Sequence, residues 1–261
     1  MAGLFDWLRR TFARGEYITG VVDPHGAGGG RSRPEQPWSL RFTLDRWRGP
    51  DGAVRTTPLT VRRPCNDAEL SDFVGRIQPY QVLGLRVRMT GPGTAELVKL
   101  VGRGDDDVLA ARAAELSARV TREDERFGTL TLNRRFGCYE CETDWDYAPI
   151  QLDLQAVEDD DLEAALRTAY ALWDQQESWS ERIDAFAVQE LLELKNDGWL
   201  GEGESPLTAD EFVARMRLVS ISVDPDGGFT FWHDDGDLFW GHSIQVTGSL
   251  ADGPTHADTP G

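Results

Sequence analysis

The charged residues of this chain divide it into a basic part and an acidic part. Residues 1–104 contain 16 Lys and Arg and 10 Asp and Glu, a net charge of +6, whereas residues 105–261 contain 11 and 35, a net charge of −24. Such a change of composition at one position is typical of a boundary between domains. With 261 residues, of which 40% are hydrophobic, the chain can bury more than one core. We therefore expect two modules, each with a core of its own.

Length and composition exclude several classes of protein. No stretch approaches the roughly 18 apolar residues that a membrane span requires. The N-terminus lacks the apolar stretch and the small-residue cleavage site of a secretory signal. Three cysteines, Cys65, Cys138 and Cys141, are too few for a disulfide scaffold. We expect a cytoplasmic protein without a membrane span.

The first module, residues 1–104, has the pattern of a small β-rich domain. Asn66 and Glu69 have the spacing of a capping box, which predicts a helix over 66–77. Alternating apolar residues predict five strands, at 16–22, 38–47, 53–63, 80–90 and 95–101. Five strands with one intervening helix fit a small barrel such as the OB-fold.

Two segments of this module lie outside the expected barrel. Apolar residues at helical spacing predict an N-terminal amphipathic helix over 4–13, namely Leu4, Phe5, Leu8 and Phe12. We expect it to pack on its own domain, the alternative being a membrane surface or a partner. Residues 23–37 are rich in Gly and Pro and predict a flexible loop. A phosphate-binding loop is not expected there, because a strand follows instead of a helix.

The acidic half predicts a connecting helix and then an α+β domain. Residues 105–124 begin with aspartates, which favour a helix N-terminus, and should form the connector. The domain proper is expected over 125–249, with a flexible tail over 250–261. Its strands are expected at 128–133, 137–146, 149–155, 217–223, 228–233 and 238–247, and its helices at 159–177, 180–197 and 208–216. This order predicts one antiparallel sheet with helices on one face.

The most distinctive segment of the acidic domain is 229–246. Its apolar residues alternate on both sides of Asp235-Gly236, and glycine accepts the positive φ of a tight turn, so a β-hairpin is predicted. Together with Phe127–Asn133 and Glu190–Trp199, this segment resembles the bacterial family known as domain of unknown function 2262. The resemblance covers roughly residues 125–258, and it implies no activity, cofactor or site residue.

Metal-binding motifs are incomplete in this chain. Cys138 and Cys141 have the spacing of zinc ligands and of thiol redox pairs. The alternation of their segment places the two side chains on opposite faces of a strand, where they cannot share a metal ion. The segment Asp234–Asp237 lacks the downstream ligands of a calcium loop. We expect no metal and no cofactor.

Two histidines flank the predicted turn. His242 is in phase with the apolar positions of its strand, which predicts a buried histidine held by a hydrogen bond. The alternative is a functional histidine that pairs with Asp234, Asp235 or Asp237 as an acid–base or metal dyad. His233 stands beside the turn and is expected to be solvated.

The arginines of the first module alternate with apolar residues on its predicted strands. A basic OB-like face with stacking aromatics suits single-stranded nucleic acid. Four residues are candidates for stacking, namely Trp38, Phe42, Trp47 and Tyr80. The net charge of +6 is modest, and the acidic half would repel a polyanion, so this function remains an alternative.

Motifs of common enzymes are missing, which favours a binding protein over an enzyme: there is no nucleophile elbow, phosphate loop, zinc quartet or dinucleotide fingerprint. We predict a non-catalytic interaction protein whose acidic domain binds a basic protein partner, as an immunity or antitoxin-like protein would. The expected contacts are aromatic residues rimmed by acids, namely Trp232, Asp234, Asp235, Asp237, Phe239 and Trp240. The alternative is a hydrolase-type enzyme centred on His242 and the acids at 234–237.

Overall fold

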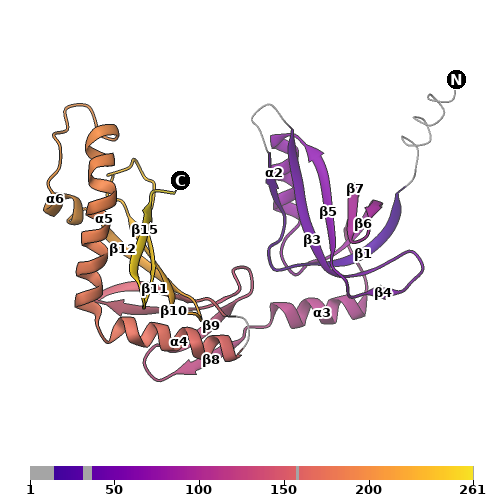
Figure 1. The fold of residues 1–261 in the computed structure, drawn as a ribbon. Coiled ribbons are helices and arrows are strands. Elements are labelled where there is room, and N and C mark those ends of the chain that lie inside the picture. Colours follow the sequence, from indigo (N-terminus) through magenta and orange to yellow (C-terminus); the bar gives the residue numbers. More distant parts are fainter. Residues whose placement is uncertain (1–14, 32–36, 157–158, 261) are drawn as a thin grey trace. The chain divides into compact units, whose positions relative to one another are not determined.

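The computed structural model describes residues 15–31, 37–156 and 159–260 and consists of two compact units. The first unit is Met1–Ala118 and the second is Arg119–Gly261 (Figure 1). The amphipathic helix expected over 4–13 lies outside the described residues. Each unit has its own core, as the division of charge predicts.

The N-terminal unit is a small β-barrel. Its wall consists of β1 (Glu16–Val22), β3 (Trp38–Arg48), β5 (Leu59–Cys65), β6 (Val82–Gly91) and β7 (Thr94–Arg103). Two short strands, β2 (Gly28–Gly30) and β4 (Val54–Arg55), pair with β3. Apolar side chains that alternate along the wall point inward and fill the barrel, among them Ile18, Leu40, Phe42, Leu44, Val61, Leu85, Val87 and Leu97.

The barrel closes on itself through its first strand. The strands pair in the order β1-β3-β5-β7-β6, and β6 pairs in turn with β1. All of these pairs are antiparallel except β5 with β7, which is parallel. A helix lies between the third and fourth barrel strands in chain order. This connectivity confirms the expected β-rich, OB-like module.

The helix α2 (Asp67–Arg76) begins at the predicted capping box. Asn66 Oδ1 accepts from the Glu69 N–H, and Glu69 Oε2 accepts from the Asn66 N–H. A Cβ at Gly29 would lie 2.4 Å from Leu70 Cδ2, so any side chain there would force Leu70 on this helix to move. The Gly-rich stretch therefore contains an ordered strand, β2, where the sequence predicted a flexible loop.

The helix α3 (Asp107–Ser117) packs on the outside of the barrel. Two ion pairs fix it there, Arg48 with Asp106 and Arg112 with Asp45. Its apolar face is buried against β1 and β6. The helix expected as a free connector over 105–124 therefore belongs to the N-terminal unit, and its last residues form a strand of the other unit instead.

The C-terminal unit is built on one open sheet of eight strands. Their order across the sheet is β15 (Gly253–Asp258), β14 (Ile244–Ser249), β13 (Gly228–Asp234), β12 (Arg217–Val223), β11 (Ala148–Leu154), β10 (Cys138–Trp145), β9 (Gly128–Asn133) and β8 (Thr121–Asp124). All neighbours are antiparallel except β11 and β12. This pair is parallel because the helices intervene between the two strands, and the chain returns across the sheet. The α+β class is confirmed, with this pair as a correction to a purely antiparallel sheet.

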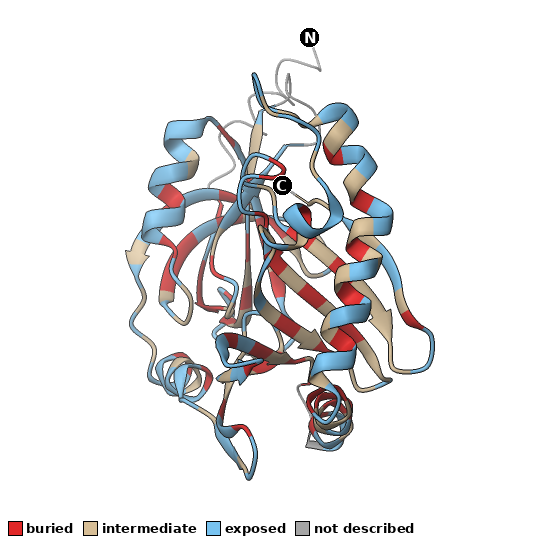
Figure 2. Ribbon diagram, turned by 90° about the vertical axis from the view of Figure 1, so that its left-hand side faces the viewer, coloured by how far each residue is buried: buried red, intermediate tan, exposed pale blue. Residues whose placement is uncertain are grey.

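Three helices connect β11 to β12, namely α4 (Asp159–Trp173), α5 (Gln176–Gly198) and α6 (Ala209–Val213). In α5, buried positions follow one side of the helix and exposed positions the other (Figure 2). The core between helices and sheet contains aromatic rings in edge contact, such as Trp145 with Trp173 at 4.8 Å and Trp179 with Phe229 at 5.0 Å between centroids. No helix among the described residues has the length and apolar character needed to cross a bilayer.

Two predictions for the end of the chain are wrong. His233 pairs with Ile244, and residues 235–243 form a loop between β13 and β14 instead of a tight turn at Asp235-Gly236. Within the tail expected to be flexible over 250–261, Gly253–Asp258 form β15, which pairs with β14 along most of its length.

Candidate functional site

The loop 235–243 is organised by one buried carboxylate. Asp235 Oδ2 accepts hydrogen bonds from the N–H groups of Phe239 at 2.7 Å and Gly241 at 3.1 Å, and its Oδ1 accepts from the Asp237 N–H at 3.3 Å. Aspartate side chains commonly bind backbone two residues further on in turns. Here the carboxylate reaches further along the chain, so the loop has a fixed shape without regular secondary structure.

This shape presents Trp240 at the surface in an unusual backbone conformation. The φ angles of Asp237 and Trp240 are +65° and +57°, in the left-handed region that bulky residues rarely adopt. The Trp240 side chain is 65% exposed, whereas Leu238 and Phe239 beside it are buried. Residues held in this region by their surroundings are frequent at functional sites.

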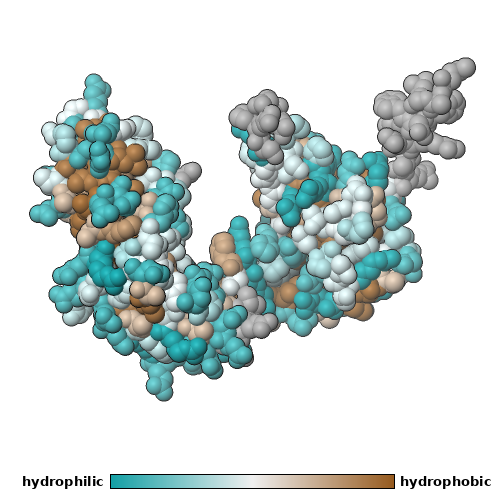
Figure 3. All heavy atoms as spheres, viewed as in Figure 1, coloured by the Kyte–Doolittle hydropathy of each residue, from teal (hydrophilic) through white to brown (hydrophobic). Residues whose placement is uncertain are grey.

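Trp240 is the outermost ring of a cluster that we call the Trp240 surface, formed by Trp199, Trp240 and His242 with Phe239 beneath them. The ring of Trp199 lies 4.8 Å from Trp240, 5.3 Å from His242 and 5.6 Å from Phe239, measured between centroids. Figure 3 shows apolar side chains gathered at the end of this unit that carries α6 and the end of α5. The cluster adjoins the core of this unit, because Phe239 belongs to that core and Trp199 packs against it.

A buried ion pair fixes Trp199. Lys195 is fully buried, and its Nζ donates to Glu204 Oε2 at 2.8 Å and to the Trp199 carbonyl at 2.7 Å. Glu204 also accepts from the Gly201 N–H at 2.9 Å and from Arg215 at 3.0 Å. The hydrogen bonds from Gly201 and Lys195 lower the pKa of Glu204 to about 2. The Gly- and Glu-rich loop 201–204 is thus anchored to the end of α5.

Three of the six predicted contact residues are exposed. Trp240 and Asp237 stand on the loop. Asp234 is exposed at the end of β13 and pairs with Arg217 at 3.0 Å. These three residues are therefore accessible to a partner.

The other three predicted contact residues are placed differently. Phe239 and Asp235 are buried, so neither side chain can meet a partner, and Asp235 acts by shaping the loop. Trp232 is half-buried on β13, and its side chain points to the face of the sheet opposite His233. The prediction failed here because it continued the strand alternation through residues that are a loop.

His242 lies in the loop and not on a strand. It is half-buried against Trp199, and its Nδ1 lies 3.3 Å from the Thr259 carbonyl oxygen. His242 and the acids at 234–237 line the same shallow hollow of about 260 Å³. Within the described part of the chain, no hydrogen bond or ion pair joins its ring to a carboxylate. His242 therefore does not form the hydrogen bond with a carboxylate that the acid–base dyad requires.

His233, expected to be solvated, is buried. The Nδ1 atom of His233 has no hydrogen-bond partner. Burial lowers the pKa of His233 to about 4, although a hydrogen bond with the Ile244 backbone acts in the opposite direction. It lines a pocket of about 280 Å³ together with Asp184 on α5. Burial raises the pKa of Asp184 to about 6. Asp184 was missed in the sequence, although its position beside the apolar stripe of a predicted helix is a usable signal.

The two cysteines of β10 lie on different faces of the sheet. Cys141 belongs to the core, whereas Cys138 lies beside Glu140 and Asp153, with ligand atoms within 4.8 Å of one another. Burial raises the pKa of Cys138 to about 12, so its thiol stays protonated. Both carboxylates accept hydrogen bonds from neighbouring amide side chains. As predicted, the two thiols cannot share an ion.

The basic face of the N-terminal unit lacks two of the four aromatic residues expected to stack on bases. Phe42 and Trp47 are buried in the barrel, where they cannot stack on bases. Arg41 and Arg62 are exposed directly opposite each other on β3 and β5, and neither forms an ion pair with a described residue. Trp38 and Tyr80 are half-buried, so the barrel offers positive charge with only part of the stacking that single-stranded nucleic acid needs.

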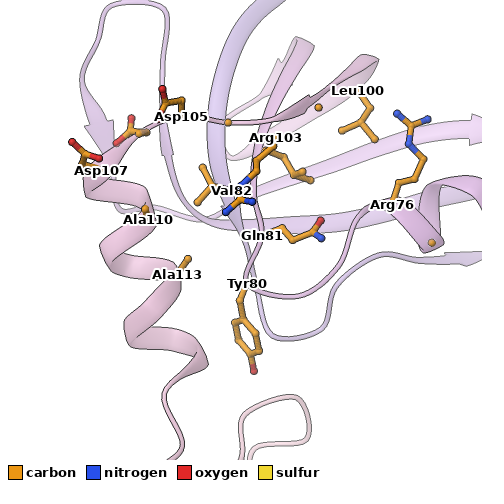
Figure 4. A pocket seen from close by; sticks show the side chains of 15 residues that line it. Arg76, Tyr80, Gln81, Val82, Leu100, Arg103, Asp105, Asp107, Ala110 and Ala113 are labelled. Carbon is orange, nitrogen blue, oxygen red and sulfur yellow. The ribbon is translucent and has the colours of Figure 1, made fainter.

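A cavity of about 730 Å³ lies in the same unit between α3 and the adjoining ends of β6 and β7 (Figure 4). Asp105 and Asp107 lie at the start of α3, and Arg76 and Arg103 lie elsewhere around the cavity. None of the unpartnered buried polar atoms among the described residues belongs to its lining. This mixture of charges does not select one ligand chemistry.

Comparison with known proteins finds a matching family model for each unit. Residues 124–259 match the family described as "Uncharacterized protein conserved in bacteria (DUF2262)", and residues 8–116 match "Domain of unknown function (DUF7021)". None of the curated proteins matches the chain. A crystal structure of a deletion mutant of the single-stranded DNA binding protein from Thermus aquaticus is similar at 13% identity and a TM-score of 0.20, over 54% of this chain and 76% of that chain. The DUF2262 match spans half of the chain and coincides with the sheet and helices described above, so the protein belongs to this bacterial family.

Proposed function

We propose that the protein is a non-catalytic binding protein whose C-terminal unit takes a basic protein partner on the Trp240 surface. The observation that carries this proposal is an indole ring, 65% exposed, held outward by a backbone in the left-handed region. Exposed apolar area is unfavourable in water, and a partner that covers the ring removes that cost. Tryptophan is also among the residues most enriched in the energetic centres of interfaces.

Charge complementarity supports a basic partner. Two exposed acids precede Trp240, Asp234 at the end of β13 and Asp237 on the loop, and residues 105–261 have a net charge of −24. A field of this sign accelerates association with a cationic surface and weakens with added salt. A cationic nuclease covered by an immunity-type protein would be one partner of this kind.

A hydrolase has less support at this place. The ring of His242 contacts Trp199 and the Thr259 carbonyl, and the carboxylate of Asp235 is occupied by backbone N–H groups. A general base must lie within hydrogen-bond reach of the proton that it removes, and a third group commonly orients it. Asp234 is paired with Arg217, and among the described residues no hydrogen bond joins Asp237 to the His242 ring.

The test compares three full-length baits in their native lysate, at low and at moderate salt: wild type, Trp240→Ala and Phe136→Ala. Phe136 is the matched control, because it is also 65% exposed on the same unit but lies outside the Trp240 surface. We expect wild type and Phe136→Ala to recover the same basic protein, and added salt to reduce its recovery.

With that protein purified, calorimetry measures the dissociation constant. Trp240→Ala should weaken binding by about 2 kcal/mol, roughly 30-fold, as the loss of an interface hot spot does. Asp237→Asn should act mainly on the association rate, because asparagine tolerates the left-handed backbone and removes only charge. Equal affinity of wild type and Trp240→Ala would show that the surface is assigned wrongly.

A further inference from the structure

A second site lies in the C-terminal unit, at the pocket that His233 and Asp184 line between the sheet and α5. We propose that this pocket binds a small organic primary amine, with the ammonium group between the Asp184 carboxylate and the His233 imidazole and the alkyl stem against the apolar wall. The site does not depend on the Trp240 surface, and its occupant is a small ligand and not a protein surface.

The inner groups of the pocket lack hydrogen-bond donors. His233 is 4% exposed, and its Nδ1 has no partner. Asp184 takes part in no hydrogen bond or ion pair with a described residue. A buried polar group without a partner costs free energy that a bound ligand of matching chemistry recovers. Ser180 on the same wall accepts from Trp145 Nε1 at 2.9 Å, which leaves its oxygen a further lone pair for a donor.

The charges of the lining favour a cation. Near neutral pH the imidazole of His233 is uncharged and Asp184 is mostly ionised, given pKa values of about 4 and about 6. Asp146 adds a second carboxylate at the rim. Arg217 also lines the pocket, but its side chain is 74% exposed and pairs with Asp234. The inner part of the pocket is therefore negative and rich in acceptors.

Size and ligand geometry narrow the class of cation. A volume of about 280 Å³ suits a head group with a stem of a few carbons and is too small for a nucleotide. The wall is apolar, formed by Ile183, Val213, Met216, Leu218 and Phe231. Among the described residues, the group of side chains with converging metal-ligand atoms lies elsewhere, at Cys138, so a metal ion fits this pocket poorly. An alkylammonium supplies both the charge and the N–H donors that the acceptors lack.

The test is calorimetric titration of the full-length protein with n-butylamine near neutral pH, with 1-butanol as the uncharged analogue. Butylamine should bind and butanol should not bind measurably. Asp184→Asn should weaken butylamine binding by about tenfold or more, as the loss of a charged hydrogen-bond partner does. Asp197→Asn is the matched control, because the same charge is removed from an exposed position of the same helix.

Two further measurements sharpen the result. The affinity should fall as the pH is lowered through about 6, where the Asp184 carboxylate gains a proton. His233, Asp146 and Arg217 face the same pocket. The pH dependence of butylamine affinity is therefore also measured for His233→Leu, which should keep that dependence because Asp184 is the titrating group. Nα-acetyl-lysine amide has the same head group on a longer stem and is titrated as a second ligand. Tighter binding than that of butylamine would identify a lysine side chain as the natural occupant, and weaker binding would identify a free amine.

Asp184→Asn should fold, because it removes a carboxylate whose charged form is disfavoured by burial. Trp240→Ala should bind butylamine like wild type, which keeps this site distinct from the protein-binding surface. Butylamine that binds no better than butanol, or an equal loss of affinity in Asp197→Asn, would overturn the proposal.

Discussion

The two units differ in how deeply they place their charged side chains. In the described part of the N-terminal unit, arginine and carboxylate pair on the outside of the barrel, and the deepest of these partners is Asp106, with a side chain 7% exposed. In the C-terminal unit Lys195, His233 and Asp235 are all buried. Exposed ion pairs contribute about 0–1 kcal/mol each, whereas a buried charge that loses its partner is strongly unfavourable. The number of charges in a unit therefore says less about its stability than the depth of a few of them.

The largest effect should come from Lys195. Lys195→Ala should destabilise the C-terminal unit by about 3–5 kcal/mol, because it removes a buried ammonium from its contacts with Glu204 and the Trp199 carbonyl. Hydrogen exchange measured by mass spectrometry on the full chain reports each unit separately.

The matched change in the other unit is Arg76→Ala, which removes an exposed pair with Asp72 at 3.0 Å. It should cost the barrel less than about 0.5 kcal/mol. Similar losses of protection from these two substitutions would break the comparison between the units.

Acid should act on the C-terminal unit first. The pKa of His233 falls from 6.5 unfolded to about 4 folded, so the folded state binds fewer protons and loses stability as the pH drops from 6.5 to about 4. The loss from His233 should approach about 3 kcal/mol at the lower end. Protonation of Asp184, whose folded pKa of about 6 lies above its usual value, offsets part of this loss over the same pH range. Glu204, with a folded pKa of about 2 against 4.5, adds a further loss as the pH falls below 4.5.

Urea unfolding of His233→Leu across this pH range tests the assignment. The variant should show a flatter dependence between pH 6.5 and 4, because leucine has no proton to gain. A slope unchanged from wild type would mean that another group controls the acid response.

A smaller effect is expected at Asp235. Asp235→Asn should cost about 2 kcal/mol, because a neutral amide cannot accept the three backbone hydrogen bonds as well as a carboxylate does. Exchange of the backbone amides of 235–243 should rise strongly in this variant. Asp237→Asn, an exposed neighbour, should leave those amides protected, and a loss of protection there would contradict the role given to Asp235.

The smallest effect should appear on the barrel surface. Arg41 and Arg62 are cross-strand neighbours of like charge, which is unfavourable. Arg41→Glu should therefore stabilise the N-terminal unit by about 0.5 kcal/mol, measured by urea unfolding. Arg41→Gln should give part of this gain, and a destabilised Arg41→Glu would mean that the two arginines do not repel each other.

The same contrast explains how much could be predicted from the sequence. The barrel strands alternate cleanly and the capping box at Asn66 marks its helix, so local patterns were sufficient. In the acidic unit, alternation through 238–243 predicted a strand, but the side chain of Asp235 binds the backbone there instead of a neighbouring strand. A carboxylate that competes with sheet hydrogen bonds has no periodic signature. For that reason His233 was expected to be solvated but is buried, whereas His242 was expected on the buried face of a strand but lies half-buried in the loop.

The last strand of the sheet has a consequence for the solubility of the chain. The barrel has no free edge along its five main strands, whereas the open sheet ends at β15, whose backbone groups could pair with another chain. This edge contains Pro254, which has no N–H to offer, and an irregular register beside Gly248. Both features hinder the addition of a further strand. Removing β15 would uncover the β-branched strand β14 with Ile244 and Val246, and would turn a protected border into a template for aggregation.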